Sequence, residues 1–328
     1  MSGRLESVAI IGGAGFIGSH FVDRLLSIPH LKHLVVFDNF SSGKQWHYEH
    51  NLGDVRLSIV TGDVRNLPTL TSALDGVRTV VHLASNPDIA AAITRPSIDF
   101  DQGSLLTHCI AEACRAVGVE QILYASGSGV YGERSNQEVD ETFGPLVPVS
   151  TYAASKLAGE ALLCSYAHMF GIQVVAFRFG NVVGPRQTHG VGFDFIRKLK
   201  LDSTRLEVLG DGNQSKPYVF VTDIIDAVML ASTKVDTEFE VFNVATLDNV
   251  SVREIADAAI EVSGLSSTNV EIAFTGGNRG WKGDVPIVKM SSRKIREIGW
   301  QQTLTSREAI YRSLRDLHSD SRHYSFHW

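Results

Sequence analysis

The segment VAIIGGAGFIGSHFVDRLL, residues 8–26, constrains the fold of this chain more than any other. Its apolar start predicts a buried strand, and the pattern after the glycines predicts a helix. Gly12, Gly13, Gly15 and Gly18 allow the backbone to turn tightly and to approach a pyrophosphate, whose charge the N-terminus of the helix would face. A strand, a glycine-rich turn and a helix in this order predict a βαβ unit that binds a dinucleotide.

Short apolar runs alternate with helical patterns through most of the chain. Buried strands are expected at 7–11, 34–37, 55–60, 77–84, 120–126, 172–179 and 239–245. Helical patterns lie near 17–28, 68–75, 100–117, 151–169, 193–200, 222–233 and 251–263. This alternation predicts the α/β class, with a mainly parallel, doubly wound (Rossmann) sheet covered on both faces. After Phe179 it gives way to loops rich in Gly, Pro and Asn, which predict a smaller mixed α/β lobe.

Composition excludes several classes of function. The chain has 328 residues, of which 44% are hydrophobic and 20% charged, so a soluble globular protein is expected. A net charge of −6 without a dense Lys/Arg run argues against a nucleic-acid partner, and strand-sized apolar stretches argue against a membrane span. The start resembles no signal peptide, and the three cysteines and scattered histidines show no metal-ligand spacing. We therefore expect a cytoplasmic protein with reduced thiols and no metal site.

Asp38 identifies the dinucleotide more closely. It ends the second expected strand, in VVFDNFSSGK, 20 residues after Gly18. A carboxylate there accepts hydrogen bonds from the adenosine ribose hydroxyls and repels a 2′-phosphate, which favours NAD over NADP. Lys44 and Arg65 are either phosphate ligands that would complicate this choice or surface cations.

The segment TYAASK, residues 151–156, places Tyr152 and Lys156 four positions apart. On a helix these positions share a face, and a nearby cation favours the anionic form of a tyrosine. One interpretation is a tyrosine acid/base whose pKa the lysine lowers. The other is an amphipathic helix with Lys156 in water, and the spacing alone does not separate them.

The ordered set of motifs resembles the extended short-chain dehydrogenase/reductases, and within them the NAD-dependent nucleotide-sugar epimerases and dehydratases. The resemblance runs nearly from end to end. It rests on GGAGFIG (12–18), Asp38, GDVR (62–65), HLAS (82–85), YASGSGVYGE (124–133), YAASK (152–156), RFGNVVGPRQ (178–187), LGDGNQSKPYVFVTDIIDA (209–227) and GWKGDVP (280–286). It implies NAD as cofactor, Tyr152 as catalytic acid/base and Lys156 as a ligand of the nicotinamide ribose.

The same resemblance implies a division of the chain and a set of cofactor-binding residues. The NAD-binding Rossmann domain is expected to comprise 1–180 and 218–268, and the nucleotide-sugar-binding lobe 181–217 and 269–328. Asp63 is either an acceptor for the adenine amino group or a turn residue. The expected NAD-binding residues are Gly12, Gly15, Phe16, Ile17, Gly18, Asp38, Asn39, Ser41, Ser42, Gly43, Asp63, Val64, Leu83, Ala84, Ser85, Tyr152 and Lys156.

One departure from the family concerns catalysis. The family places Ser or Thr three residues before the valine of VYG, where its hydroxyl binds the reacting sugar oxygen, but this chain has Gly127 there. Either Ser128 or Ser126 takes this catalytic role, or Ser126 only satisfies a strand-end amide. Dehydratases of the family carry an Asp-Glu pair just before that valine, and this chain has Ser128 and Gly129.

Other departures concern the substrate. Lys216 stands in a stretch that often holds Arg, and Trp281 replaces an arginine, so that Lys216, Arg279 or Lys282 is left to bind a diphosphate. Trp281 either stacks on a base or sugar or packs in the core. Arg186 either lines the sugar pocket near C6, where it would favour a uronate, or is a structural or surface residue. The expected substrate-binding residues are Ser128, Asn181, Arg186, Lys216, Tyr218, Arg279, Lys282 and Asp284.

The resemblance leads to one main functional hypothesis and two alternatives. The main one is NAD-dependent C4 epimerisation of a UDP-linked hexose, UDP-glucose/galactose or UDP-glucuronate/galacturonate, through a transient 4-keto sugar. The alternatives are a dehydratase, decarboxylase or reductase, and a non-catalytic NAD-binding regulator. The helices near 100–117 and 151–169 either pair with a second subunit in a homodimer, as is common in the family, or only pack on the sheet.

Overall fold

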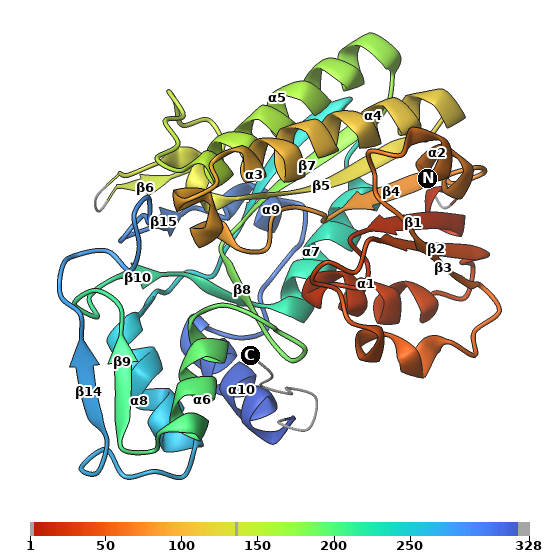
Figure 1. The fold of residues 1–328 in the computed structure, drawn as a ribbon. Helices are drawn as coiled ribbons and strands as arrows, with labels where there is room; N and C mark the ends of the chain where they lie inside the picture. Colours follow the sequence, from red (N-terminus) through yellow and green to blue (C-terminus); the bar gives the residue numbers. More distant parts are fainter. Residues whose placement is uncertain (1–2, 135–136, 321–328) are drawn as a thin grey trace.

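The computed structural model describes residues 3–134 and 137–320. Its centre is a seven-stranded parallel sheet in the order β12-β7-β5-β4-β1-β2-β3 (Figure 1). The strands are β1 (Ser7–Ile11), β2 (His33–Asp38), β3 (Leu57–Thr61), β4 (Thr79–His82), β5 (Gln121–Gly127), β7 (Gln173–Phe179) and β12 (Phe239–Val244). The expected doubly wound α/β class is confirmed, and each strand overlaps the apolar run that predicted it.

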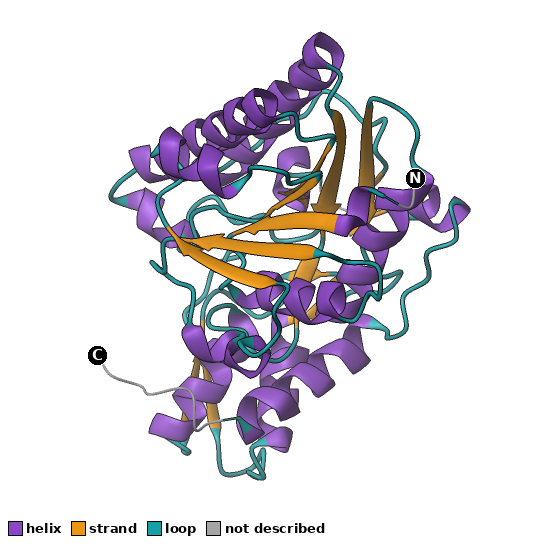
Figure 2. Ribbon diagram, turned by 90° about the vertical axis from the view of Figure 1, so that its right-hand side faces the viewer, coloured by secondary structure: helices purple, strands orange, loops and turns teal. Residues whose placement is uncertain are grey.

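Helices cover both faces of the sheet because successive strand residues point to opposite sides. In β1, Ala9 and Ile11 join the core under one layer, whereas Val8 and Ile10 join the core under the other. The first layer holds α2 (Leu67–Ala73), α3 (Ser97–Asp99), a π-helical turn (Phe100–Ser104), α4 (Leu105–Val117) and α5 (Thr151–Phe170). The second holds α1 (Phe16–Leu26) and α7 (Val221–Lys234). Figure 2 shows helices on both sides of the strands.

The strand order creates a switch point between β1 and β4. From β1 the chain winds outward to β2 and β3, and then crosses back to β4 on the other side of β1. Open α/β sheets bind ligands at the carboxyl ends of the strands where the winding reverses. The topology therefore places a ligand between the loop after β1 and the loop after β4.

A smaller lobe lies below the sheet in Figure 1. It contains α6 (Val191–Leu201), α8 (Val252–Val262) and α10 (Ser306–Ser319), with the parallel pair of β9 (Arg205–Val208) and β14 (Glu271–Phe274). The remaining elements are short: β6 (Glu138–Val139), β8 (Asn181–Val183), β10 (Ser215–Lys216), β11 (Tyr218–Phe220), β13 (Val250–Ser251), β15 (Lys289–Met290) and α9 (Arg293–Glu297).

The packing of two helices differs from the expected domain boundaries. Helix α8 contacts α6 and α10 in the small lobe, although the sequence placed 251–268 with the Rossmann domain. Conversely, α9 packs on β12 at the edge of the large sheet, although the sequence placed 269–328 in the small lobe. Residues 321–328 of that expected lobe lie outside the described residues. Which lobe a helix joins depends on contacts far along the chain, and local patterns do not encode these.

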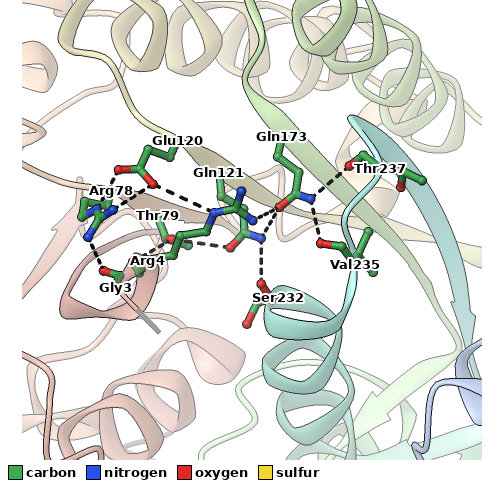
Figure 3. A network of polar contacts seen from close by, with 10 residues as sticks. All are labelled: Gly3, Arg4, Arg78, Thr79, Glu120, Gln121, Gln173, Ser232, Val235 and Thr237. Carbon is green, nitrogen blue, oxygen red and sulfur yellow. Dashed lines mark hydrogen bonds and ion pairs between the residues drawn. The ribbon is translucent and has the colours of Figure 1, made fainter. Parts of the chain in front are cut away.

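A polar network closes the sheet at the ends of the strands opposite the switch point (Figure 3). Gln121 Nε2 donates to Gln173 Oε1 at 2.7 Å and to the Ser232 carbonyl at 3.0 Å. Beside it Arg78 Nε donates to Glu120 Oε1 at 2.7 Å. These groups satisfy one another, which leaves the carboxyl ends of the strands as the open side.

No helix in the described ranges is both long and apolar enough to cross a bilayer.

Candidate active site

The carboxyl ends of β1, β4, β5 and β7 open onto a cavity of about 500 Å³ between the sheet and the small lobe. This size is typical of a small-molecule site. Its lining residues come from the segments 12–18, 83–89, 125–129, 150–156, 179–192 and 281–288, with Asp38, Ser42, Lys216 and Tyr218. Among the described residues, no group of three or more His, Cys, Asp or Glu side chains could hold a metal ion.

The glycine-rich turn after β1 forms one wall of this cavity. Gly12 has a φ of +86°, and a Cβ there would lie 2.8 Å from the Ala84 backbone nitrogen in the loop after β4. A Cβ at Gly18 would lie 2.4 Å from the Gly12 carbonyl oxygen. Side chains are thus excluded from the turn, and α1 begins beside the cavity at Phe16. Bare backbone and a helix N-terminus fit the pyrophosphate of a dinucleotide.

Asp38 lines the cavity at the end of β2. Its Oδ2 accepts a hydrogen bond from the Ala14 backbone N–H at 2.9 Å, and its Oδ1 accepts one from Phe40 at 2.8 Å. Burial raises the pKa of this carboxyl group, while backbone N–H groups oppose the shift. These bonds tie the carboxylate to the glycine-rich turn, where a ribose next to a bound pyrophosphate would meet it.

Tyr152 and Lys156 lie one turn apart on α5, and both line the cavity. Lys156 Nζ donates to the Ala125 carbonyl at 2.8 Å and lies 5.6 Å from the centroid of the Tyr152 ring. Burial lowers the pKa of Lys156 to about 8. Burial also raises the pKa of Tyr152, although the Ser85 hydroxyl donates to the phenol oxygen and opposes this. In the protein alone, the lost hydration of the phenol outweighs the lowering expected from Lys156.

The two serines near the floor of the cavity have different surroundings. Ser126 Oγ donates to Glu160 Oε1 at 2.5 Å, so its hydroxyl satisfies a buried carboxylate. Ser128 lines the cavity at the start of the 3₁₀ turn Ser128–Tyr131. Between them, a Cβ at Gly127 would meet nothing within 4 Å. At Gly127, where the family that this chain resembles carries a Ser or Thr hydroxyl, the cavity therefore has open space.

The expected substrate side of the cavity holds one ion pair. Lys216 Nζ lies 2.6 Å from Asp284 Oδ1, and both residues line the cavity. Asn181 and Tyr218, which are hydrogen-bonded to each other, also line it. Arg279 does not line it; its guanidinium donates to Glu133 Oε2 at 2.7 Å and to the Asp284 carbonyl at 2.6 Å. Lys216 is thus placed to meet an anionic group, with Asp284 as its counterion in the free protein.

Several expected site residues lie outside the lining of this cavity: Asn39, Ser41, Gly43, Asp63, Val64, Arg186, Arg279 and Lys282. Gly43 packs beside Asp38, and Asn39 accepts a hydrogen bond from the Ser41 backbone. Asp63 forms an ion pair with Arg65 at 2.5 Å. These contacts describe the protein without ligand, and the roles assigned to these residues stay predictions.

Arg186 differs most from its expected place. Its Nη1 lies 2.8 Å from Asp23 Oδ2 on α1, and its backbone has a φ of +64°. The next residue, Gln187, lines the cavity. The left-handed turn directs the guanidinium toward α1, where the carboxylate of Asp23 holds it. This geometry agrees with the structural alternative for Arg186.

Asn86, His189 and Trp281 line the cavity but were absent from the expected sets of binding residues. Asn86 lies in the loop after β4, and His189 lies just before α6. Trp281, for which stacking and core packing were both open, also lines the cavity. Burial lowers the pKa of His189. The place of Asn86 directly after a buried strand next to the glycine-rich turn was an available signal, because loops at that edge converge.

Replacement of Asp38 is expected to alter nucleotide preference. Asp38→Ala should weaken NAD binding by roughly tenfold to a hundredfold, since hydrogen bonds to a charged group are worth about 1.5–3 kcal/mol. It should also relax discrimination against NADP, because the charge that repels a 2′-phosphate is gone. Asp38→Asn is the matched variant that keeps one acceptor oxygen for the backbone. Titration of both nucleotides measures the effect, and unchanged preference in both variants would contradict it.

Comparisons with known proteins agree with this geometry. The model of the NAD dependent epimerase/dehydratase family matches residues 8–245. A UDP-glucose 4-epimerase of Lacticaseibacillus casei is 29% identical over 337 residues, which cover 96% of this chain and 97% of that protein. A UDP-galactose 4-epimerase crystal structure superposes with a TM-score of 0.83 at 34% identity, covering 96% of this chain and 99% of that one. A dTDP-glucose 4,6-dehydratase from Streptomyces venezuelae with NAD bound gives 0.88 at 25% identity, with 97% and 99% covered.

Proposed function

The chain belongs to the NAD dependent epimerase/dehydratase family, and we propose that it inverts C4 of a UDP-linked hexose through a transient 4-keto sugar. One observation carries this proposal. The end of β5 and the turn after it line the cavity with Ser126, Gly127, Ser128 and Gly129, none of which is a carboxylate. The names of the similar 4-epimerases support UDP as the nucleotide.

In this proposal Tyr152 is the acid/base. Its phenolate takes the proton of the C4 hydroxyl, and the phenol returns a proton to O4 when the sugar is reduced again. Lys156 holds the nicotinamide ribose, and its ammonium favours the phenolate. NAD, when bound, accepts the hydride from C4 and gives it back. Inversion at C4 follows when the keto sugar turns its opposite face toward the nicotinamide before the hydride returns. The cavity has to be large enough for this rotation.

The cavity argues against dehydration. Elimination of water from a 4-keto hexose needs a base at C5 and an acid at the C6 oxygen. Among the described lining residues the carboxylates are Asp38, beside the glycine-rich turn, and Asp284, which is paired with Lys216. Glu133 follows the turn after β5 in the sequence, but it does not line the cavity and pairs with Arg279. With no acid/base couple beside Tyr152, return of the hydride is the exit open to the 4-keto sugar.

The surroundings of Arg186 favour a hexose with a neutral C6 over a uronate. A uronate carboxylate needs a cation near C6, and Arg186 was the candidate. Its guanidinium is paired with Asp23, and recruiting it would break that ion pair. UDP-glucose and UDP-galactose are therefore the proposed substrates, with Lys216 and Asn181 at the diphosphate.

Ser128 is expected to contact the sugar. Ser128→Ala should lower kcat/KM by roughly tenfold to a hundredfold, since one hydrogen bond that strengthens in the transition state is removed. Ser126→Ala is the matched control, because Ser126 donates to Glu160, and it should lower stability more than turnover. Steady-state kinetics with thermal unfolding of each variant measures both effects. The reverse pattern would assign the catalytic hydroxyl to Ser126.

Product analysis in deuterated water tests the reaction itself. UDP-glucose and UDP-galactose are each incubated with the NAD-loaded protein, and the sugar is followed by NMR. Epimerisation predicts inversion at C4 and no deuterium at C5. Deuterium at C5, a methyl signal from C6 or released carbon dioxide would replace this proposal with dehydration or decarboxylation. NAD binding without turnover of any UDP-sugar would favour a regulator.

We also propose a cytoplasmic homodimer. Helices α4 and α5 lie side by side in the layer above the sheet in Figure 1, and Phe100 in the preceding turn is 60% exposed. A second copy could cover this layer. Cys109, Cys114 and Cys164 are free, as is usual in a reducing compartment. Sedimentation of the purified protein measures the oligomeric state.

A further inference from the structure

Asp99, the last residue of α3, joins two parts of the cavity wall. It is 1% exposed. Its Oδ1 accepts a hydrogen bond from Asn86 Nδ2 at 2.9 Å, and its Oδ2 accepts one from Thr151 Oγ1 at 2.6 Å. Asn86 lines the cavity in the loop after β4, and Thr151 begins α5 directly before Tyr152. One carboxylate therefore ties the wall of the cavity to the start of the catalytic helix.

The backbone that follows Asp99 packs closely against α5. The π-helical turn Phe100–Ser104 follows directly, and such turns often occur at functional sites. Within it, a Cβ at Gly103 would lie 2.5 Å from Ser155 Oγ. Helix α5 therefore packs closely against the turn that directly follows Asp99.

The charge of Asp99 is not compensated by a close cation. None of the ion pairs formed by the described residues includes Asp99, and its two hydrogen-bond partners are neutral. The charged and titratable groups around Tyr152 are Lys156 on the same helix, Tyr124 on β5 and Asp99 on α3. Burial is the largest cause of the raised pKa of Tyr152; the Ser85 hydroxyl lowers this pKa, and the charge of Asp99 is a smaller cause that raises it.

We propose that Asp99 is a positioning residue that fixes the Asn86 wall against α5 and places a negative charge at the start of that helix. The proposal rests on the proposed function, in which Tyr152 is the acid/base. Burial is the main cause of the raised pKa of Tyr152, and the charge of Asp99 adds to it, so that positive charge entering the cavity favours the phenolate. Proton transfer is thereby coupled to occupancy of the site.

The test replaces the charge and keeps the shape. Asp99→Asn retains an acceptor oxygen for Asn86, and its amide can donate to Thr151. The acidic limb of the pH profile of kcat should move to lower pH by about 1 unit, the order of the effect of removing one negative charge near a titrating group in a protein interior. Thr151→Val breaks one hydrogen bond but keeps the charge, and it should not move the limb down. Asp101→Asn, in the adjacent turn, is the control and should leave the profile unchanged.

A second readout does not depend on turnover. The absorbance of the Tyr152 phenolate is followed against pH, with the Tyr152→Phe variant subtracted in both the wild-type and Asp99→Asn backgrounds. The Asp99→Asn curve should move to lower pH by the same amount. An unchanged curve in a variant whose thermal unfolding is wild-type overturns the proposal. A shifted curve without turnover of any UDP-sugar would uphold the role of Asp99 and reject the proposed reaction.

Discussion

Tyr152→Phe should lower epimerase turnover by roughly a hundredfold or more, the usual scale for loss of a general acid/base. In the proposed reaction the phenol oxygen takes the C4 proton, and the neighbouring hydroxyls of Ser85, Ser126 and Ser128 cannot hold that proton at neutral pH. The fold should persist because only a hydroxyl is removed. Single-turnover and steady-state assays with NAD-loaded protein measure the loss.

Tyr166→Phe supplies the matched control for this prediction. Tyr166 lies on the same helix, but its hydroxyl donates to Glu112, and it does not line the cavity. Its removal should leave turnover close to wild type. A Tyr152→Phe protein of unchanged rate would return the YAASK segment to the interpretation as an ordinary helical stripe.

Glu160→Gln should destabilise the fold by about 3–5 kcal/mol, the range observed when one partner of a buried ion pair is removed. Glu160 Oε2 lies 2.7 Å from Arg178 Nη2, and both side chains are 5% exposed. The variant keeps the shape but leaves a guanidinium charge between α5 and β7 without its counterion. Denaturant unfolding of the NAD-free protein measures the loss.

Two further variants test whether burial of the Glu160–Arg178 pair is the reason for this loss of stability. Glu297→Gln disrupts the exposed pair with Arg293, whose side chains are 66% and 80% exposed, and should change stability little. Ser126→Ala removes one of the donors to Glu160 and should give an intermediate loss. Similar effects for Glu160→Gln and Glu297→Gln would show that the buried pair is not the reason.

Much of the site followed from local sequence because backbone conformation carries it. The strand before Gly12 and the helix that begins at Phe16 are encoded by neighbouring residues, and the close approach of strand, turn and helix requires that Gly12 and Gly18 lack a Cβ. The spacing of Tyr152 and Lys156 requires only that α5 form. Ser150 caps that helix by accepting a hydrogen bond from the Ala153 backbone N–H, which is also a local feature.

Side chains that act through distant partners could not be predicted in this way. Arg186 and Arg279 were expected near substrate, but the carboxylates that hold them, Asp23 and Glu133, lie far away in the sequence. Ser126 faces Glu160 for the same reason. The long cationic side chains reach whichever carboxylate the fold brings near, and a motif does not record that partner.

By itself, the sequence determined the doubly wound sheet, the dinucleotide turn and the spacing of Tyr152 and Lys156 on one helix, because short-range periodicity and glycine sterics govern each of them. The tertiary structure alone decided which lobe α8 and α9 join, which of the expected cations line the cavity, and that Asp99 contacts the residue before Tyr152. These features depend on long-range packing. Asp99 reaches Thr151, 52 residues away, only because α3 packs against the first turn of α5.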